Sequence, residues 1–453
     1  MRAINPATGG LIEEYPDHET AEVERRLAVA ADTFSRWGSA PFAERRLRMQ
    51  RVAQLLRERS RDLSVLMARE MGKPVREGAA EIEKCAWATE FFAERAESYL
   101  SDGIVATDAK KSYVAYLPLG IVLAVMPWNF PFWQVIRFAA PALMAGNVAL
   151  LKHAPSVPGC ALALETLFAD AGFPSGVLQV LFVDESRVGE LIDDPRVVAV
   201  TLTGSTRAGR AVASRAGHAL KKTVLELGGS DAYVVLEDVD VARAASIGVA
   251  ARLINAGQSC IAAKRFVVVD AVRARFEEAF VDGMTRAIVG DPMDPQTEVG
   301  PLSRVELRDA LHVQVTQSVE RGATLLLGGV VPEKPGAWYP PTVLADVVPG
   351  MPAFDEEVFG PVAAIVPAKD ETAAIRLANA TSYGLGAAVL TGDDDRGERI
   401  ARDGLAAGAC FVNAQVRSDP RLPFGGIRSS GYGRELGAFG IREFTNVKTV
   451  WIS

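Results

Sequence analysis

The chain alternates over most of its length between short apolar runs and longer amphipathic stretches. The first part differs, because residues 21–37 and 42–71 carry apolar positions at spacings of three and four with charges opposite, which predicts helices. From about Tyr113, apolar runs of strand length alternate with Ala-rich stretches of helical length. That alternation is typical of parallel sheets covered by helices, and it predicts a doubly wound α/β fold.

The predicted elements fall into two successive units. The first unit has predicted strands at Ile121–Met126, Val148–Leu151, Val177–Phe182, Val198–Thr203 and Thr223–Leu227. Its predicted helices are Pro131–Met144, Gly159–Ala171, Ser186–Ile192 and Thr206–Ala216. After Gly228 the alternation resumes with a helix at Val241–Ile254 and a strand at Arg265–Val269, and it continues to about Val412, which predicts a second unit of the same class.

The C-terminal region is predicted to add a helix at Arg434–Phe444 and a strand at Val447–Ile452. A separate strand is predicted at Lys111–Leu117. Strands of this kind pair either within the chain or between subunits, and the pattern leaves both arrangements open.

Composition narrows the class of protein. A chain of 453 residues has room for two or three domains, and 49% apolar with 23% charged residues excludes disorder as the main state. Lys and Arg number 49 against 56 Asp and Glu, a net charge of −7, which argues against nucleic acid or an anionic membrane as partner.

Residues 118–136 carry no charge, but Pro127 and Pro131 would leave backbone groups unsatisfied in a bilayer. We therefore interpret this segment as buried core.

The cysteines and histidines predict no structural metal site. Four cysteines and four histidines are scattered without paired spacing, which favours neither a disulfide framework nor a zinc cluster. The first residues, Met1–Pro6, lack the apolar core of a secretory signal. We therefore expect a protein of the reducing cytoplasm.

Polar side chains follow several of the predicted strands. They are Asn129, Lys152, the segment Thr203–Ser205 and Glu226. Ligands of open parallel sheets bind beyond the carboxyl ends of the strands, so these residues predict one shared crevice. Each also has a structural alternative: Asn129 bonds its own turn, Lys152 extends from a strand end, or Glu226 pairs with Lys221 or Lys222.

Cys260 lies on a predicted loop just past a helix whose end is marked by Gly257. A lone cysteine is more often a small buried apolar residue than a nucleophile, and Cys85, Cys160 and Cys410 fit that description. No histidine stands in a motif, and no Gly-x-Ser-x-Gly sequence occurs. Both observations argue against cysteine-histidine and serine hydrolases.

Six short motifs occur in a fixed order along the chain. They are Pro127–Pro131, Thr203–Ser205, Glu226–Gly229, Gly257–Cys260, Glu356–Pro361 and Pro423–Gly426. Together they resemble the aldehyde dehydrogenase family, over nearly the whole chain. The resemblance implies two doubly wound, Rossmann-like α/β domains with a small β oligomerisation element, and a homodimer or homotetramer. It places an NAD(P)-binding domain in residues 1–100 and 119–228, a catalytic domain in 229–433, and the oligomerisation element in 101–118 and 434–453.

The resemblance also implies the catalytic roles. Cys260 would attack the aldehyde, since a carbonyl carbon must become tetrahedral before it releases hydride, and a thiolate can later leave from a thioester. Asn129 and the backbone N–H of Cys260 would hold the oxyanion. Glu226 would be the general base that activates water against the thioester. An acid at this position argues against the CoA-acylating branch of the family.

For the cofactor, the resemblance implies a dinucleotide held by both halves of the chain. The residues concerned are Trp128, Lys152, Gly204, Ser205, Glu357 and Phe359. The third residue after Lys152 is Pro155, so no acid repels a 2′-phosphate there. Lys152, His153 and Ser156 could hold that phosphate, and we expect NADP in preference to NAD while NAD use stays open.

Arg137 is the candidate for substrate recognition, because an arginine on an apolar helix requires an anionic partner. That partner is either a structural Asp or Glu or a carboxylate of the substrate. Residues 132–141 and 418–424 resemble the short-form bacterial succinate-semialdehyde dehydrogenases, which implies that Arg137 and Ser418 hold the far carboxylate. Arg417 departs from the subgroup, so glutarate semialdehyde or another ω-oxo acid stays open.

Ile261 and Ala262 follow Cys260, so no local disulfide is expected.

Two competing functions remain at this point. An aldehyde dehydrogenase for uncharged aldehydes would not depend on Arg137. A thioester or ester hydrolase built on Cys260 would work without a dinucleotide. A purely binding protein is disfavoured, because nucleophile, base and oxyanion donor are all present.

Overall fold

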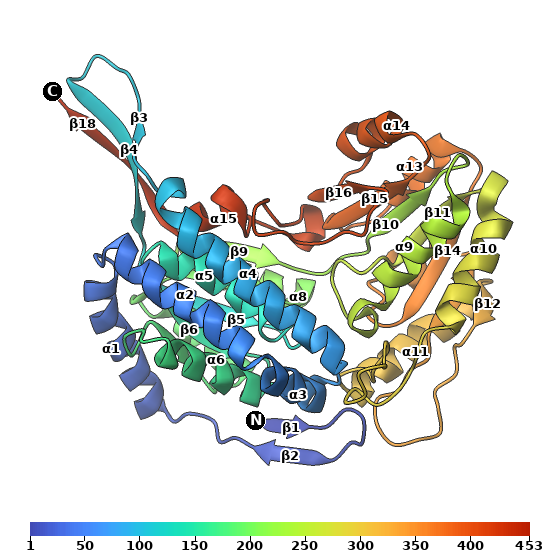
Figure 1. Ribbon diagram of the computed structural model, residues 1–453, viewed down its shortest axis with the longest axis horizontal. Helices are drawn as coiled ribbons and strands as arrows, with labels where there is room; N and C mark the ends of the chain where they lie inside the picture. The colour runs from blue at the N-terminus through green and yellow to red at the C-terminus, as the bar shows by residue number, and fades with distance from the viewer.

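Two parallel sheets, each covered by helices, form two lobes of the molecule (Figure 1). The structure is a computed structural model that describes residues 1–453. The strand order of the first sheet is β17-β9-β8-β5-β6-β7. Its parallel strands are β5 (Ile121–Met126), β6 (Val148–His153), β7 (Leu178–Val180), β8 (Val197–Thr203) and β9 (Lys222–Glu226). The short β17 (Gly431–Tyr432) pairs antiparallel with β9 at the edge.

Eight α-helices accompany the first sheet. They are α1 (Thr20–Trp37), α2 (Phe42–Glu58), α3 (Ser60–Met71), α4 (Val75–Tyr99), α5 (Trp133–Met144), α6 (Pro158–Asp170), α7 (Val188–Asp193) and α8 (Thr206–His218). Helices α2, α3 and α5 all pack against α4. Every residue of α5 is buried, including Gln134 and Arg137. Such a helix needs polar partners inside the protein for those two side chains.

The second sheet has the strand order β12-β13-β14-β11-β10-β15-β16. Its strands are β10 (Ala232–Val235), β11 (Arg265–Val269), β12 (Thr324–Leu327), β13 (Thr342–Ala345), β14 (Val362–Ala368), β15 (Gly386–Leu390) and β16 (Ala409–Val412). All neighbours run parallel except β12 and β13. The helices of this lobe are α9 (Val241–Leu253), α10 (Asp270–Thr285), α11 (Val305–Glu320), α12 (Pro352–Asp355), α13 (Glu371–Asn379) and α14 (Asp394–Arg399).

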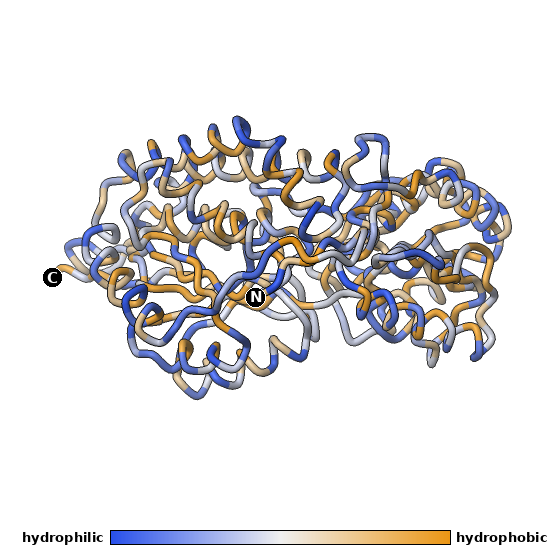
Figure 2. The backbone as a smooth tube through the Cα atoms, turned by 90° about the horizontal axis from the view of Figure 1, so that it is seen from below, coloured by the Kyte–Doolittle hydropathy of each residue, from blue (hydrophilic) through white to orange (hydrophobic).

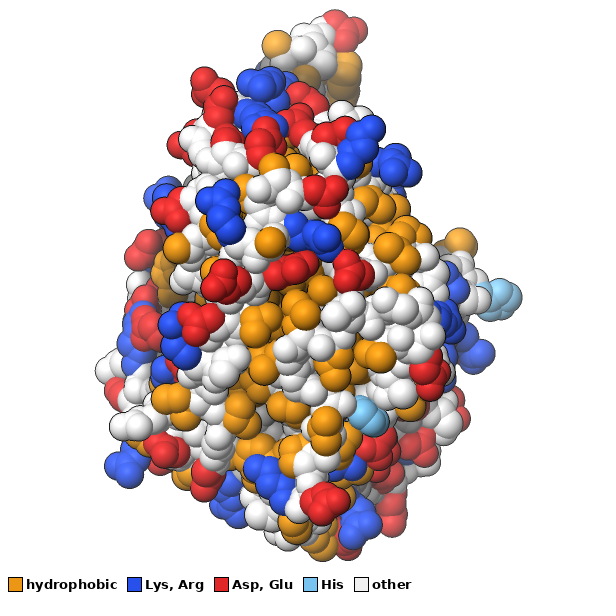
Figure 3. Space-filling model, turned by 90° about the vertical axis from the view of Figure 1, so that its right-hand side faces the viewer, with side chains coloured by type: hydrophobic (Ala, Val, Ile, Leu, Met, Phe, Trp, Pro, Cys, Tyr) orange, Lys and Arg blue, Asp and Glu red, His pale blue; other side chains and the backbone are white.

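Each lobe has its own apolar core. Apolar segments concentrate inside each lobe, and polar segments lie toward its outside (Figure 2). On the surface of the lobe that carries α10 and β12, charged side chains of both signs surround scattered apolar ones (Figure 3). No helix is both long enough and apolar enough to span a membrane.

A three-stranded antiparallel arm extends from the first lobe (Figure 1). It contains β3 (Gly103–Ile104), β4 (Lys111–Pro118) and β18 (Thr445–Ile452), and α15 (Gly437–Glu443) precedes β18. Strands β4 and β18 pair along their whole length, from Lys111 opposite Ile452 to Pro118 opposite Thr445. The two strands that the sequence predicts here therefore pair with each other within the chain. A hairpin of β1 (Arg2–Ile4) and β2 (Leu11–Glu14) begins the chain.

The predicted elements agree with the structure except at several ends. Strands β5 and β11 have the predicted bounds, whereas the strand predicted at 177–182 is shorter. The single helix predicted at 42–71 is wrong, because α2 and α3 are separate helices divided at Arg59. The helix predicted at 186–192 begins as a 3₁₀ turn over Glu185–Arg187. Two doubly wound α/β units are confirmed as the fold class, and the domain boundaries given above stay predictions.

Candidate active site

Cys260 lies on a loop that the chain enters through a strained turn. Helix α9 ends at Leu253, and Asn255, Ala256 and Gly257 follow with φ of 53°, 52° and 73°. Glycine is required at 257, because a Cβ there would lie 2.1 Å from the carbonyl oxygen of Gly360. A residue other than glycine costs free energy when its backbone adopts the left-handed conformation. Such strain is commonly retained at functional sites.

The loop is held from inside by the buried Lys264. Its Nζ donates hydrogen bonds to the carbonyl oxygens of Ser259 at 3.0 Å, Cys260 at 2.8 Å and Ala262 at 3.1 Å. An ammonium group has three N–H donors, and the backbone of the loop that carries Cys260 accepts a hydrogen bond from each of them. The position of Cys260 is thereby fixed.

Cys260 lines a cavity of about 350 Å³. Aromatic side chains form part of the wall, namely Phe130, Trp133 and Phe424. The polar side chains of the wall include Lys84, Gln134, Arg137, Arg417 and Ser418. A mainly apolar pocket with a few convergent polar groups is the usual form of a small-molecule site.

Asn129 follows β5 and is buried next to the Cys260 loop. Its Nδ2 donates to the carbonyl oxygen of Gln258 at 3.0 Å, and its own carbonyl oxygen accepts from Asn255 Nδ2 at 2.7 Å. These bonds cross to the nucleophile loop, so the alternative in which Asn129 bonds its own turn is wrong. The side-chain amide is thus held against the loop of Cys260, and its role as an oxyanion donor stays a prediction.

Glu226 ends β9 and is almost completely buried, and neither of its carboxylate oxygens has a hydrogen-bond partner. The structural alternative for it is wrong, since Lys221 donates to backbone carbonyls and Lys222 pairs with Glu443 at 3.0 Å. Burial raises the pKa of Glu226 to about 8, against the opposing charge of Arg137. A buried carboxyl group without a structural partner and with a pKa near neutrality is suited to general-base chemistry.

The thiol of Cys260 is half-buried. Burial raises its pKa to about 12, while the charges of Arg137 and Lys264 oppose that rise and Glu226 adds to it. Burial thus favours the thiol form of Cys260 over the thiolate. The effect of Glu226 on the thiol pKa is electrostatic, which is consistent with a base close to the nucleophile.

Arg137 has the structural partner that the sequence left open. It forms an ion pair with Glu435, and its Nη2 donates to Thr203 Oγ1 at 3.3 Å. The guanidinium also lies 4.9 Å from the ring centre of Phe424 and lines the cavity. The acid partner is thus Glu435, and a contact of Arg137 with substrate stays a prediction.

Ser418 lines the same cavity and is buried. Its hydroxyl accepts a hydrogen bond from Lys84 Nζ at 2.8 Å. No motif in the sequence predicts Lys84, Glu435, Lys264 or Asn255 as residues of this site. Lys84 lies within α4 beside exposed charged residues. Its local sequence therefore resembles that of a charged residue on the solvent-exposed face of a helix, and it does not indicate that the side chain enters a cavity.

Three of the predicted cofactor residues come together from the two lobes. The rings of Trp128 and Phe359 meet edge to face, 5.8 Å apart between their centres. Glu357 accepts a hydrogen bond from the backbone N–H of Gly229 at 2.9 Å, and burial raises its pKa. Trp128 follows β5 of the first sheet, while Glu357 and Phe359 follow α12 of the second lobe.

The other predicted cofactor residues lie at the carboxyl ends of β6 and β8. Lys152 is buried within β6, and burial lowers its pKa. The hydroxyl of Ser156 is buried and has no hydrogen-bond partner. Gly204 donates its N–H to the carbonyl oxygen of Glu226 at 2.9 Å, and Ser205 caps α8 by accepting from Ala208 N–H at 3.2 Å. A buried hydroxyl without a hydrogen-bond partner costs free energy unless a ligand supplies that partner. The hydroxyl of Ser156 is therefore suited to bind a polar ligand.

His153 is not available to bind such a ligand. The prediction that it helps to hold a 2′-phosphate is wrong. It is buried, one ring nitrogen lies 2.9 Å from the carbonyl oxygen of Pro131, and the other accepts from Ala154 N–H. Burial lowers its pKa to about 4. A neutral ring with both nitrogens occupied brings no positive charge to a phosphate.

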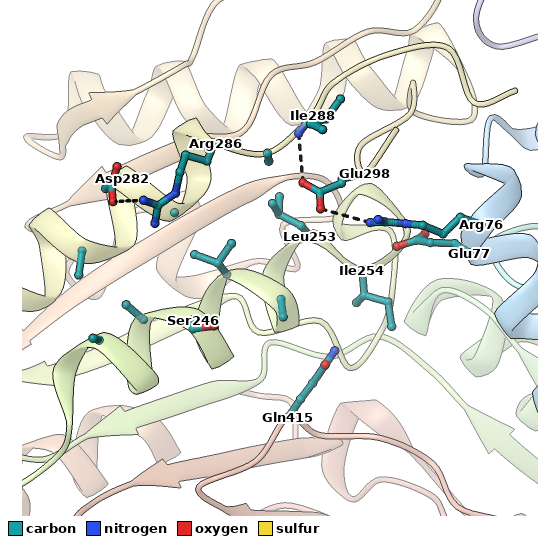
Figure 4. Close-up of a pocket in the computed structure, with 17 residues that line it drawn as sticks. Arg76, Glu77, Ser246, Leu253, Ile254, Asp282, Arg286, Ile288, Glu298 and Gln415 are labelled. Carbon is teal, nitrogen blue, oxygen red and sulfur yellow. Dashed lines mark hydrogen bonds and ion pairs between the residues drawn. The ribbon is translucent and has the colours of Figure 1, made fainter. Parts of the chain in front are cut away.

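A larger depression, of about 810 Å³, lies between the helices of the second lobe and the start of α4 (Figure 4). It is lined mainly by α9 and α10, and Arg76 and Glu298 form an ion pair of 3.3 Å beside it. Glu77, Ile254 and Gln415 line both this depression and the cavity of Cys260, so the two hollows share a wall. The depression has no cysteine or histidine in its lining, and no group of three or more potential ligand side chains that could hold a metal occurs in the protein. The Cys260 cavity is therefore the candidate active site.

Known proteins resemble this chain over its full length. The sequence profile of the Aldehyde dehydrogenase family matches residues 1–450. The probable NADP(+)-dependent succinate-semialdehyde dehydrogenase of Synechocystis sp. is 48% identical over 453 residues, which are 100% of both chains. The succinate semialdehyde dehydrogenase Sad of Escherichia coli, named for NAD(P)+, is 44% identical over 99% of this chain and 97% of its own.

Solved structures agree with these sequence relationships. The succinic semialdehyde dehydrogenase from Streptococcus pyogenes, in complex with NADP+, has a TM-score of 0.97 at 35% identity and covers 100% of this chain and 99% of its own. An NAD-dependent aldehyde dehydrogenase from Sinorhizobium meliloti has a TM-score of 0.97 at 32% identity, and the match covers 100% of this chain and 91% of its own. The resemblance and the fold class predicted from the sequence are confirmed.

Proposed function

Because the chain belongs to the aldehyde dehydrogenase family, we propose that it oxidises succinate semialdehyde to succinate, with NADP in preference to NAD. The observation that carries this proposal is that one cavity is lined both by Cys260 and by the cationic and hydroxyl groups of Arg137, Lys84 and Ser418. A nucleophile and an anion-binding group in one small cavity suit an aldehyde with a carboxylate at its other end. The relatives from Synechocystis and E. coli that carry the name of this activity support it.

In the proposed reaction, the sulfur of Cys260 attacks the aldehyde carbon and a C–S bond forms. The thiol proton passes to water, and the positive charges of Arg137 and Lys264 ease this loss because they oppose the effect of burial on the thiol pKa. The carbonyl oxygen becomes an alkoxide, which accepts hydrogen bonds from the amide of Asn129 and the backbone N–H of Cys260. These donors are fixed before the reaction begins, because Asn129 is already bonded to the nucleophile loop.

The dinucleotide, when bound, supplies a cationic ring that accepts the hydride. The remaining thioester on Cys260 is then hydrolysed. Glu226 accepts a proton from the attacking water, the C–S bond breaks and the sulfur leaves as a thiolate. A carboxylate free of structural hydrogen bonds is available for this step.

The residues present fit a phosphorylated dinucleotide. The buried hydroxyl of Ser156 lacks a partner, and Lys152 brings a positive charge to the same end of the first sheet. Pro155 stands where an acid would repel a 2′-phosphate. Lys152 and Ser156 would hold the adenosine end, Gly204 and Ser205 the pyrophosphate, and Trp128, Glu357 and Phe359 the nicotinamide end.

The cavity itself supports a short substrate. About 350 Å³ with walls from Phe130, Trp133 and Phe424 suits an unbranched chain of a few carbons. Arg417 is exposed and also lines the cavity, and this favours glutarate semialdehyde as the second candidate substrate. A longer ω-oxo acid would bring its carboxylate nearer to that arginine.

We further propose that the protein is a homodimer or homotetramer. The three-stranded arm exposes apolar side chains, among them Ile104 at 70%, Val447 at 59% and Trp451 at 51%. Exposed apolar side chains that gather on a projecting sheet are typical of surfaces that pair between copies. Light scattering on the purified protein tests this, and a monomer at micromolar concentration would contradict it.

Reduction of NADP and of NAD, followed by nicotinamide absorbance, tests the function. Succinate semialdehyde is compared with butyraldehyde, an uncharged molecule of similar length. We expect kcat/KM for the semialdehyde to exceed that for butyraldehyde by more than about tenfold, since charged hydrogen bonds supply that much discrimination. Equal values would instead indicate an enzyme for uncharged aldehydes. Ester hydrolysis as the sole activity, without a dinucleotide, would indicate a hydrolase.

A further inference from the structure

Lys84 places an ammonium group in the wall of the active-site cavity. It comes from α4, its Nζ donates to Ser418 Oγ at 2.8 Å, and it lies 4.3 Å from the ring centre of Trp133. The ammonium group therefore lies over the ring of Trp133 and is directed at a residue of the cavity. Neither contact supplies a negative charge.

The acids near Lys84 have other partners: Glu77, which also lines the cavity, accepts a hydrogen bond from the backbone N–H of Asn255 at 2.9 Å, and three others are paired with cations. Glu81 forms a buried ion pair with Lys73, and Asp419 pairs with Arg421 at 2.6 Å. Glu435 is paired with Arg137. Lys84 itself forms no ion pair, so it is an uncompensated positive charge in a largely enclosed site.

Arg137 differs from Lys84 in this respect. Its guanidinium is already paired with Glu435, so it attracts a further anion less strongly than an unpaired cation would. A carboxylate that enters the cavity finds its counter-charge in Lys84. Ser418 accepts from Lys84 with its oxygen and still has a hydroxyl hydrogen to donate.

We propose that Lys84, with Ser418 as its hydroxyl partner, binds the far carboxylate of the substrate and thereby sets the preference for ω-oxo acids over uncharged aldehydes. Arg137, already paired with Glu435, lies beside these two residues in the wall of the cavity. The inference rests on the proposed function, because it names the acid-binding group of the same cavity.

The electrostatic surroundings give the inference a pH signature. The charged and titratable groups that surround Lys84 are Glu77, Glu81 and Cys85 on α4, Arg137 on α5, Arg417 and Asp419 on the loop after β16, and Cys260. Burial, followed by the charge of Arg137, lowers the pKa of Lys84 to about 8. Above that pH the free enzyme loses its counter-charge, so the preference for the acid should decline while steps shared by all aldehydes affect both substrates alike.

Two variants and one surface control test the proposal. Lys84→Met keeps an unbranched side chain of similar length and removes the charge, Lys84→Arg keeps the charge, and Lys369→Met alters a lysine that is 82% exposed. Each protein is assayed with NADP, once with succinate semialdehyde and once with butyraldehyde. We expect Lys84→Met to reduce the ratio of the two kcat/KM values by about 10- to 100-fold through a higher KM for the acid. Lys84→Arg should recover most of that ratio, and Lys369→Met should leave both substrates unchanged.

Wild-type enzyme provides a test that needs no variant. The ratio of kcat/KM for the two substrates, measured from pH 6.5 to 9.5, should fall as pH passes about 8. A constant ratio would overturn the inference, as would a Lys84→Met protein that loses both activities equally or keeps the full ratio. If the wild-type enzyme shows no preference at any pH, the proposed function fails together with the inference. A wild-type preference that survives in Lys84→Met refutes the inference alone.

Discussion

Arg137 and Glu435 form an ion pair in the interior, with side chains 2% and 4% exposed. Removal of one partner from such a pair leaves a buried charge uncompensated, whereas removal of both does not. We expect Arg137→Met and Glu435→Met each to lower the free energy of unfolding by about 3–5 kcal/mol, and the double variant to lose much less than the sum. Urea unfolding followed by tryptophan fluorescence measures this. Additive losses would mean that the two charges do not stabilise each other.

The pH dependence of turnover should follow Glu226. Since a general base must be deprotonated, and burial raises the pKa of Glu226 to about 8, kcat for butyraldehyde should fall as pH drops below that value. Glu435 contributes to the raised pKa through its negative charge. Glu435→Gln removes that charge, so the acidic limb of the profile should move to lower pH. An unmoved limb, or a shift to higher pH, would exclude this electrostatic coupling.

Glu226→Gln separates the two halves of the reaction. The amide cannot accept a proton from water, so we expect one equivalent of reduced dinucleotide per active site in a rapid phase and then slow turnover. The steady-state rate should fall by about 10²- to 10⁴-fold. Stopped-flow absorbance resolves the two phases. If the rapid phase disappears as well, Glu226 is needed before thioester hydrolysis, and its proposed role is incomplete.

The sequence predicted the residues whose signal is local. The local pattern predicts Asn129 and Glu226 at the ends of strands and Cys260 on a loop after a helix, and the structure places them there, whereas their catalytic roles follow only from the family resemblance. Contacts between distant segments gave no such signal. The burial of Arg137 indicated that it needs an anion, but its partner Glu435 lies near the other end of the chain.

The position of His153 next to Lys152 in one strand argues against a shared role in binding a phosphate. Strand β6 continues through Lys152 to His153, and successive side chains of a strand point to opposite faces. The two residues therefore could not both face one phosphate. The break between α2 and α3 at Arg59 had no comparable signal, because neither Gly nor Pro marks it.

Cofactor preference should depend on Ser156. Its buried hydroxyl lacks a partner, and a carboxylate in its place would repel a 2′-phosphate. We expect Ser156→Glu to lower kcat/KM for NADP by about tenfold or more relative to NAD. Ser39→Glu, at an exposed site on the same lobe, is the control. An unchanged ratio between the two dinucleotides would place the 2′-phosphate elsewhere.

Lys264 should affect every substrate alike, in contrast to Lys84. It binds three carbonyl oxygens of the Cys260 loop, and its charge opposes the rise in the pKa of the Cys260 thiol. Lys264→Met should therefore lower kcat for succinate semialdehyde and butyraldehyde by a similar factor, about tenfold or more. Lys264→Arg should not restore it, because a planar guanidinium cannot reproduce the three donors of the ammonium.

Alkylation of Cys260 separates this role from a general loss of stability. Without the positive charge of Lys264 the thiol pKa should rise further, so the rate of reaction with iodoacetamide at pH 8 should fall while Lys369→Met reacts as wild type. Cys410 is the other cysteine that is not fully buried, so a Cys410→Ala background keeps the signal specific. Unchanged alkylation together with a lower melting temperature would show that Lys264 only stabilises the fold. Slower alkylation with a wild-type melting temperature would show that the lysine positions and charges the nucleophile loop.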